Sequence, residues 1–227
     1  MKNQSKKIAV ILLGLPGCGK DTQANLLAEK FGLFHVESSK LIREKLNSEP
    51  KMEEEKNEIA REKEKYAKGE LNTPAFVTNL INQKIKEKGE SGRGIVFSGS
   101  PRTPFEREQE MPVLGEIYGK ENIYIFYLKI NPELTFWRLT HRRICEKCGA
   151  PVPFLPETEN LKICAKCGGK LIPRGLDKPE IIAQRLKSYE EGTKPVIDFF
   201  ENENQMIEIH GDQPIQKVFN DIVSYIA

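Results

Sequence analysis

A glycine-rich loop lies between an apolar segment and a helical pattern near the start of the sequence. The apolar segment is Ile8–Leu13, the loop is Gly14–Thr22, and the helical pattern covers Gln23–Phe31. Loop glycines let successive backbone N–H groups turn toward anionic oxygens, and the N-terminus of a helix adds partial positive charge. The side chain of Lys20 can reach the outer phosphates of a nucleotide. The order strand, loop, helix therefore predicts a nucleotide-phosphate site, and the alternative is a glycine-rich turn that binds nothing.

The same region resembles a secretion signal. Lys2, Lys6 and Lys7 precede an apolar run that ends in Leu15–Cys18, as in a bacterial lipoprotein signal. We disfavour this interpretation because the run is short, a proline lies beside the cleavage site, and Lys20 and the loop glycines would have no role. Nothing else in the sequence is long or apolar enough to span a membrane. We expect a cytoplasmic protein without a membrane partner.

The composition is that of a globular protein. The 227 residues include 38% hydrophobic and 30% charged residues, enough for one core with small appendages. The formal net charge is +2. Proteins that bind nucleic-acid duplexes usually carry a basic surplus, so we expect no nucleic-acid partner.

Four of the five cysteines form two C-x-x-C pairs. The pairs are Cys145 with Cys148 and Cys164 with Cys167, and the segment between them, Gly149–Ile163, carries the Pro and Gly residues of a hairpin. This spacing is typical of a zinc ribbon. Two disulfides are disfavoured in the cytoplasm, and redox activity is disfavoured by the presence of two pairs outside a thioredoxin-like context. Four thiolates complete a tetrahedral sphere, which predicts a structural metal; zinc is expected, although iron suits the same donors.

Strand and helix patterns alternate along the rest of the chain. Buried strands are expected at Ile95–Phe97, Ile123–Ile130 and Met206–Ile209, and amphipathic helices at Thr73–Lys88, Pro132–Arg143, Pro179–Tyr189 and Ile215–Ala227. This order predicts an α/β fold with a parallel sheet between helices. The charged stretch Lys51–Lys68 predicts a solvated, mobile helix that ends at Gly69, with pairs such as Glu64 and Lys68 at helical spacing.

Together these residues resemble the adenylate kinases and related nucleoside monophosphate kinases, in the long form whose lid carries zinc. The resemblance covers essentially the whole chain, and the order and spacing of its motifs are specific. It rests on Gly14–Thr22 with Gln23, Val36–Arg43, Leu71–Thr73, Gly99–Thr103, Arg138, His141–Arg143, the four cysteines, Pro173–Arg174 and Gln184–Leu186.

The resemblance implies a three-layer α/β/α core of the P-loop NTPase type with two appended parts. The core would comprise residues 1–36, 75–138 and 177–227, the helical monophosphate-binding flap residues 37–74, and the zinc-ribbon lid residues 139–176. The flap and lid would close over the substrates and exclude water. The implied reaction is the reversible, Mg²⁺-dependent transfer of the γ-phosphoryl group of ATP to AMP, giving two ADP, and the family is usually monomeric.

The resemblance also assigns residues to this reaction, which depends mostly on alignment and on cations around the transferring group. The implied catalytic residues are Lys20, Arg102, Arg142, Arg174 and Arg185. The implied ATP site comprises Gly14, Pro16, Gly17, Cys18, Gly19, Lys20, Asp21, Thr22, Arg138, Arg142 and Gly211. The implied monophosphate site comprises Ser38, Arg43, Leu71, Thr73, Gly99, Arg102, Glu106, Arg174 and Arg185. Arg107 and Arg143 are expected to be solvated surface charges, and Cys18 to be chemically inert.

Several carboxylates of the family pattern are missing. Ser98 replaces the family's Asp at the end of a strand, Lys40 replaces an Asp of the flap, and Leu176 replaces the first of two paired aspartates. Asp21, in turn, occupies a loop position that is normally glycine, next to Thr22. We hypothesise that Asp21 orients the hydrated Mg²⁺ while Lys40 offsets phosphate charge. The alternative is a nucleotide-binding regulatory protein with slow or no turnover.

The acceptor nucleotide is also in question, because Glu106 replaces the family glutamine that pairs with adenine. An ionised carboxylate only accepts hydrogen bonds, so it would suit the adjacent donors of guanine or the amino group of cytosine. AMP is the leading prediction from the whole-chain resemblance, GMP or CMP is the alternative, and a solvent-exposed Glu106 is a third possibility. A nucleic-acid-binding ribbon is disfavoured because Pro151–Glu159 is Pro-rich and acidic, with Phe154 as its lone aromatic residue.

Overall fold

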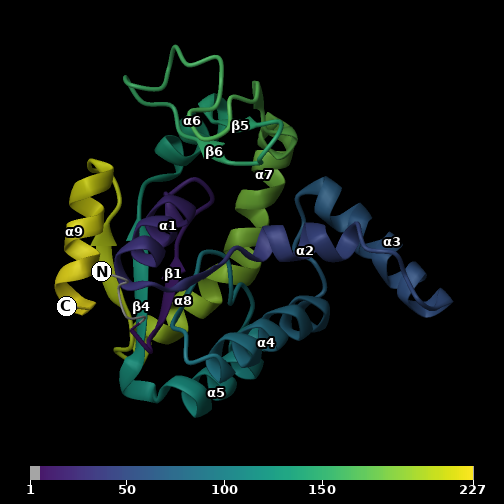
Figure 1. Ribbon diagram of the computed structural model, residues 1–227, viewed down its shortest axis with the longest axis vertical. Coiled ribbons are helices and arrows are strands. Elements are labelled where there is room, and N and C mark those ends of the chain that lie inside the picture. Colours follow the sequence, from purple (N-terminus) through teal and green to yellow (C-terminus); the bar gives the residue numbers. More distant parts are fainter. Residues whose placement is uncertain (1–5, 227) are drawn as a thin grey trace.

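The computed structural model describes residues 6–226, and its centre is a sheet of five parallel strands. The spatial order is β2-β3-β1-β4-β8 (Figure 1). The strands are β1 (Ala9–Leu13), β2 (Phe34–Val36), β3 (Ile95–Phe97), β4 (Ile123–Lys129) and β8 (Ile207–His210). Every residue of β1 is buried. A continuous apolar run of this kind is typical of a parallel strand that helices cover on both faces.

Helices pack in two layers around this sheet. The first layer contains α1 (Lys20–Phe31) and α9 (Ile215–Ile226), which contact each other. The second contains α4 (Pro74–Glu90), α5 (Pro104–Tyr118) and α8 (Lys194–Asn202), with α5 in contact with both of the others. The predicted α/β/α architecture with a central parallel sheet is confirmed. No helix within residues 6–226 is long and apolar enough to cross a membrane.

Two helices, α2 (Ser38–Leu46) and α3 (Glu53–Lys68), extend away from the sheet (Figure 1). One buried side chain ties α3 to the chain that follows: Oε2 of Glu62 accepts hydrogen bonds from the Thr73 backbone N–H and the Asn72 side chain, both at 2.8 Å. The expected pair of Glu64 with Lys68 is present at 2.7 Å. The helix ends at Gly69 as predicted, where φ is +77°.

A second, three-stranded sheet carries the cysteine pairs, between α6 (Pro132–His141) and α7 (Pro179–Ser188). Its order is β6 (Pro151–Val152), β5 (Arg143–Cys145) and β7 (Leu171–Pro173), and both pairings are antiparallel. The segment Gly149–Ile163 was expected to form the hairpin that brings the cysteine pairs together, but its residues Pro151–Val152 pair with β5, which precedes the segment. Two chain reversals therefore bring the cysteines together, one at each C-x-x-C pair.

Two arginines that were expected to be solvated are packed instead. Both terminal guanidinium nitrogens of Arg143 donate to backbone carbonyls, those of Leu161 and Thr158, so this side chain braces the small sheet. The side chain of Arg107 is only 14% exposed, and its guanidinium lies 3.5 Å from the centroid of the Phe199 ring. Both expectations were wrong because the contacting groups lie far away in the sequence, where no local pattern relates them to Arg107 or Arg143.

The sequence located most of the long elements of the core but missed others, besides the short strands of the small sheet. β2, α2, α5 and α8 were not predicted; β2 has three residues, and α5 carries an internal proline, Pro112. The helix expected to reach Arg143 ends at His141, because Arg143 joins β5. Ala227, the predicted end of the last helix, and Lys2 lie outside the described residues.

Candidate active site

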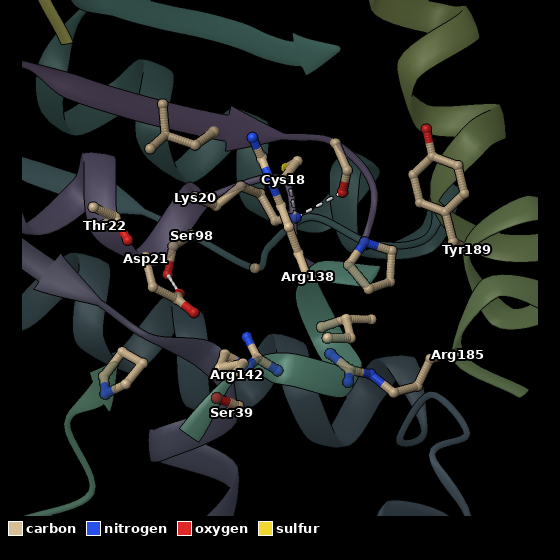
Figure 2. A pocket seen from close by; sticks show the side chains of 18 of the residues that line it. Cys18, Lys20, Asp21, Thr22, Ser39, Ser98, Arg138, Arg142, Arg185 and Tyr189 are labelled. Atoms are coloured by element: carbon tan, nitrogen blue, oxygen red, sulfur yellow. Dashed lines mark hydrogen bonds between the residues drawn. The ribbon is translucent and has the colours of Figure 1, made fainter. Parts of the chain in front are cut away.

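A cavity of about 470 Å³ lies beside the carboxyl ends of β1 and β3 (Figure 2). The chain leaves β1 toward β2 on one side of the sheet and later adds β4 and β8 on the other, so the strand order reverses here. Open α/β sheets bind ligands at such a point. The lining residues come from the glycine-rich loop, α2, the segments after α3 and β3, α6, the small sheet, α7 and the loop after β8.

The glycine-rich loop adopts a conformation that requires its glycines. Gly14 has φ of +140°, and a Cβ there would lie 2.6 Å from the carbonyl oxygen of Leu128, so the loop can pass β4 only at a glycine. The ammonium of Lys20 turns back into the loop and donates to the carbonyls of Gly14 at 2.7 Å and Leu15 at 2.9 Å. Its Nζ also lies 3.4 Å from Sγ of Cys18, which is buried. The loop therefore holds a cation at the place where phosphates are expected.

Asp21 and Ser98 meet across the junction of β1 and β3. The Ser98 hydroxyl donates to Oδ1 of Asp21 at 2.6 Å (Figure 2). Nε2 of His35 lies 2.7 Å from the same hydroxyl oxygen. Burial alone would raise the pKa of Asp21, but the Ser98 hydrogen bond and the charges of Lys20, His35 and Arg142 outweigh it and hold the pKa below its ordinary value. The cavity therefore contains an ionised carboxylate on the first turn of α1.

An arginine pair shares one buried carboxylate. Asp177 accepts hydrogen bonds from Nε and Nη2 of Arg142, both at 2.9 Å, and from Nη1 of Arg185 at 2.7 Å. Burial, together with the positive charges of Arg174 and Arg142, lowers the pKa of Arg185 to about 10, although Asp177 opposes this. Arg174 lines the same cavity. Three guanidinium groups thus gather around a space that suits a phosphoryl group.

Arg102 and Glu106 form another part of the wall. A Cβ at Gly99 would lie 2.6 Å from a terminal nitrogen of Arg102, so a glycine leaves room for this guanidinium. Glu106 is only 1% exposed, and its Oε2 accepts a hydrogen bond from the Arg102 backbone N–H at 2.7 Å. The possibility of a solvent-exposed Glu106 was therefore wrong. At Gly192, in the π-helical turn Tyr189–Thr193, a Cβ would meet Leu71, so this turn packs directly against the wall.

Aromatic residues line the cavity near Arg138, whose Nη2 donates to the carbonyl of Gly211 at 3.3 Å. The Trp137 and Phe154 rings meet edge to face with centroids 5.7 Å apart, which connects α6 to the segment after β6. The sequence assigns no role to Trp137, and Phe154 enters only as the lone aromatic residue of a segment that does not suit nucleic acid. The sequence signal that could have marked Trp137 as part of the site is a tryptophan within the predicted amphipathic helix, where the structure leaves it exposed. Nothing in the sequence indicated that Phe154 is its partner.

All residues of the implied ATP site line the cavity, from Gly14 to Gly211. Seven of the nine implied monophosphate-site residues also line it, and the exceptions are Arg43 and Thr73. Nη2 of Arg43 lies 3.8 Å from Glu37, and Thr73 is hydrogen-bonded to Glu62. Lys40 is exposed and does not line the cavity, so this conformation gives no support to the idea that it offsets phosphate charge.

The four cysteines converge as the spacing predicts. Their sulfur atoms all lie within 4.8 Å of one another, with Cys145 and Cys167 at 3.4 Å and Cys148 and Cys164 at 3.8 Å. A tetrahedral zinc ion with Zn–S bonds of about 2.3 Å separates its sulfurs by about 3.8 Å. The donor set and its spacing therefore fit zinc. Leu171 packs with Cys145 and Cys164 in a small core of its own.

Comparisons with known proteins agree with this geometry. The family model described as adenylate kinase matches residues 12–205. An adenylate kinase of Caldanaerobacter subterraneus subsp. tengcongensis is 32% identical over 216 residues, covering 94% of this chain and 93% of that protein. Adenylate kinases of Thermoanaerobacter pseudethanolicus and of a Geobacillus species are 32% and 30% identical, each covering 94% of this chain and 95% of the relative. The chain belongs to the adenylate kinase family and is a phosphotransferase of the nucleoside monophosphate kinase class.

Proposed function

We propose that this chain transfers the γ-phosphoryl group of ATP reversibly to AMP, giving two ADP, in a Mg²⁺-dependent reaction in the cytoplasm. The observation that carries the proposal is the convergence of Lys20, Arg102, Arg142, Arg174 and Arg185 on one cavity. These cations come from the glycine-rich loop, the segment after β3, the end of α6, the segment after β7, and α7. A protein that only bound nucleotides would have no need for so many charges around one transferring group.

Each part of the wall has a role in this proposal. The glycine-rich loop and Lys20 hold the donor phosphates, Arg138 lies against the donor base, and Arg102 holds the acceptor phosphate. Arg142, Arg174 and Arg185 then surround the phosphoryl group between the two nucleotides. Because their guanidinium groups are already gathered there, little reorganisation is needed when charge develops in the transition state.

We also propose that residues 37–74 and 139–176 act as a flap and a lid that close over the substrates. The flap helices α2 and α3 extend away from the sheet, and Phe154 of the lid contacts Trp137 of the core. Closure would bring Arg43 toward the acceptor and exclude water, which favours transfer to a nucleotide over hydrolysis. We propose that the protein acts as a monomer, as its resemblance to the family implies.

The proposal is tested by a coupled phosphoryl-transfer assay with ATP and Mg²⁺ against AMP, with Lys20→Ala as the inactive control. Turnover of AMP that is lost in the control supports the kinase. Measurable ATP binding without turnover of any nucleoside monophosphate would favour the alternative, a nucleotide-binding regulatory protein. The specific observation that keeps this alternative open is the absence of the family carboxylates at Ser98, Lys40 and Leu176.

We propose that Asp21 replaces one of these carboxylates in the handling of Mg²⁺. Its carboxylate is ionised, touches the Ser98 hydroxyl and lies beside Thr22 in the cavity wall, a donor set that suits Mg²⁺ and its bound waters. Bound Mg²⁺ would neutralise charge on the donor phosphates. Within the chain, the Ser98 hydroxyl, itself in contact with His35, holds Asp21 in place, so the carboxylate of this chain lies on α1, next to the residue after β3 where the family carries its own.

Replacing Asp21 with asparagine is expected to raise the Mg²⁺ concentration at half-maximal activity by about 10- to 100-fold, because a hydrogen-bonded carboxylate near the ion is lost. Fluorescence titration of an ATP analogue with and without Mg²⁺ should show the same loss of Mg²⁺-dependent affinity. Asp198→Asn, which alters an exposed carboxylate on α8, is the matched control. If Asp21→Gly, the family residue, were as active as the wild type or more so, Asp21 would have no such role.

The metal of the four-cysteine cluster is expected to be zinc and to act structurally. Two of its ligands are buried beside Leu171, and no other described group of His, Cys, Asp or Glu residues has metal-binding spacing. Removing the metal with a chelator should lower the melting temperature by several degrees without abolishing ATP binding, because the cluster lies in the lid and the phosphate loop in the core. Elemental analysis identifies the ion, and loss of ATP binding in the metal-free protein would contradict a role confined to the lid.

A further inference from the structure

Glu106 lines the cavity, and its carboxylate has hydrogen-bonding capacity to spare. Glu106 lies in the first turn of α5, where Thr103 caps the helix by accepting a hydrogen bond from the Glu106 backbone N–H. Oε2 of Glu106 accepts from the Arg102 backbone N–H at 2.7 Å and from the Ser100 hydroxyl at 3.3 Å. An ionised carboxylate offers about four acceptor positions. Those that remain are available to a ligand beside Arg102.

A second carboxyl group, Glu110, lies behind this one and influences its charge. The Ser100 hydroxyl oxygen lies 2.7 Å and 2.9 Å from the two oxygens of Glu110, which is 1% exposed and does not line the cavity. Burial and the neighbouring Glu106 charge raise the pKa of Glu110 well above its ordinary value. Compared with an ordinary carboxyl group, the raised pKa favours the neutral form of Glu110. Glu106, which lines the cavity, is therefore the member of the pair that more readily carries the negative charge.

The ionised and the neutral form of such a carboxyl group suit different nucleobases, because the bases differ in the hydrogen-bond donors and acceptors along their edges. Guanine presents two adjacent donors, N1–H and the 2-amino group, which an ionised carboxylate accepts together. Adenine presents one donor, its 6-amino group, beside the acceptor nitrogen N1, whose lone pair faces the second carboxylate oxygen unfavourably. A neutral carboxylic acid matches adenine, because its carbonyl accepts and its hydroxyl donates, as an amide would.

We propose that Glu106 admits a guanine-bearing nucleoside monophosphate as a second acceptor at the site proposed for AMP. The inference rests on the proposed function, in which Arg102 holds the acceptor phosphate and so places the acceptor base near Glu106. The ionised form of Glu106 accepts from guanine, and the neutral form pairs with adenine. GMP is thus phosphorylated by the same donor, ATP, with the same catalytic arginines. The products are ADP and GDP, a pair of nucleoside diphosphates as in the reaction with AMP.

A pH dependence of the acceptor preference follows from the groups around Glu106. Burial raises the pKa of Glu106, whereas the Arg102 backbone N–H and guanidinium, and the hydroxyls of Ser100 and Thr103, oppose this. Glu110 on the same helix contributes no charge while it remains neutral. Below the pKa of Glu106 the neutral acid favours AMP, and above it the carboxylate favours GMP. The ratio of kcat/KM for GMP to that for AMP should therefore rise with pH.

The test compares kcat/KM for GMP, IMP and AMP in the wild type and in Glu106→Gln. IMP retains the N1–H donor but lacks the 2-amino group, so the wild type should use it less well than GMP. An amide matches adenine but not guanine, so Glu106→Gln should shift the ratio of GMP to AMP efficiency by about 10- to 100-fold toward AMP, the worth of one bidentate base contact. Glu116→Gln makes the same chemical change at an exposed position on α5 and should leave the ratio unchanged.

The outcomes separate this inference from the proposed function. AMP turnover with no GMP turnover, or a GMP to AMP ratio that Glu106→Gln leaves unchanged, would overturn the role of Glu106 and leave the AMP kinase intact. Absence of turnover with every acceptor would instead remove the proposed function. If Glu106→Gln does not fold, as its melting curve would reveal, the wild-type ratio measured against pH decides the matter: a ratio that does not rise with pH contradicts the inference.

Discussion

Replacing Lys20 with alanine is expected to lower kcat for phosphoryl transfer by about 10²- to 10³-fold, the usual effect of removing one group that stabilises charge in a transition state. Its ammonium lies inside the glycine-rich loop, 2.7 Å from the carbonyl oxygen of Gly14, and is the cation that this loop contributes. The backbone N–H groups of the loop remain in the variant. Binding of ATP should therefore weaken less than kcat falls.

The measurement is the initial rate at saturating ATP and AMP, together with the melting temperature. Lys194→Ala is a suitable control, because Lys194 is half exposed on α8 and, among residues 6–226, forms its ion pair with Asp198, which is itself about half exposed. Both variants should melt within a few degrees of the wild type, since Gly14, whose carbonyl Lys20 leaves behind, lines the cavity. A Lys20→Ala variant that kept more than a tenth of the wild-type kcat would mean that the donor phosphates bind elsewhere.

Local sequence patterns were sufficient to predict the phosphate loop and the metal cluster. The loop depends on glycines and a lysine within nine consecutive residues, Gly14–Thr22, and the cluster on two pairs of close cysteines. In both cases the ligand groups are arranged by the backbone immediately around them. The strands β1, β3 and β4 could be predicted equally well from local sequence, because continuous apolar runs identify strands that are buried on both faces.

Features that depend on distant contacts could not be predicted in this way. The hydrogen bond between Asp21 and Ser98 joins residues 77 positions apart and exists because β3 lies next to β1 in the sheet. The sequence suggested an exchange of carboxylates, but only the strand order places the two residues in contact. Likewise, the sequence left open whether Glu106 meets the acceptor base or is exposed to solvent, and its burial follows only from the placement of Ser100 and Glu110 beside it.

Replacing Asp177 with asparagine is expected to destabilise the nucleotide-free protein by about 3 kcal/mol, the lower end of the range for removing one partner of a buried ion pair. The Asp177 side chain is 3% exposed, whereas its partners Arg142 and Arg185 are 14% and 19% exposed, and this partial solvation favours the lower figure. The loss corresponds to a fall in melting temperature of about 6–12 °C for a chain of this size. The control is Asp198→Asn, because Asp198 is an exposed carboxylate paired with a lysine. This substitution should change the free energy of unfolding by less than about 0.5 kcal/mol.

Nucleotide should restore more stability to Asp177→Asn than to the wild type. In the free protein Asp177 is the anion that balances Arg142 and Arg185, and Arg174 adds a further positive charge nearby. Phosphates must share these guanidinium groups with Asp177 in the wild type, but in the variant they supply the missing negative charge. The increase in melting temperature on saturation with ATP should therefore be larger in Asp177→Asn, although kcat falls because the guanidinium groups are less firmly oriented. Equal increases in the two proteins would mean that the phosphates do not bind at this arginine cluster, and the assignment of Arg142 and Arg185 to the transferring group would be wrong.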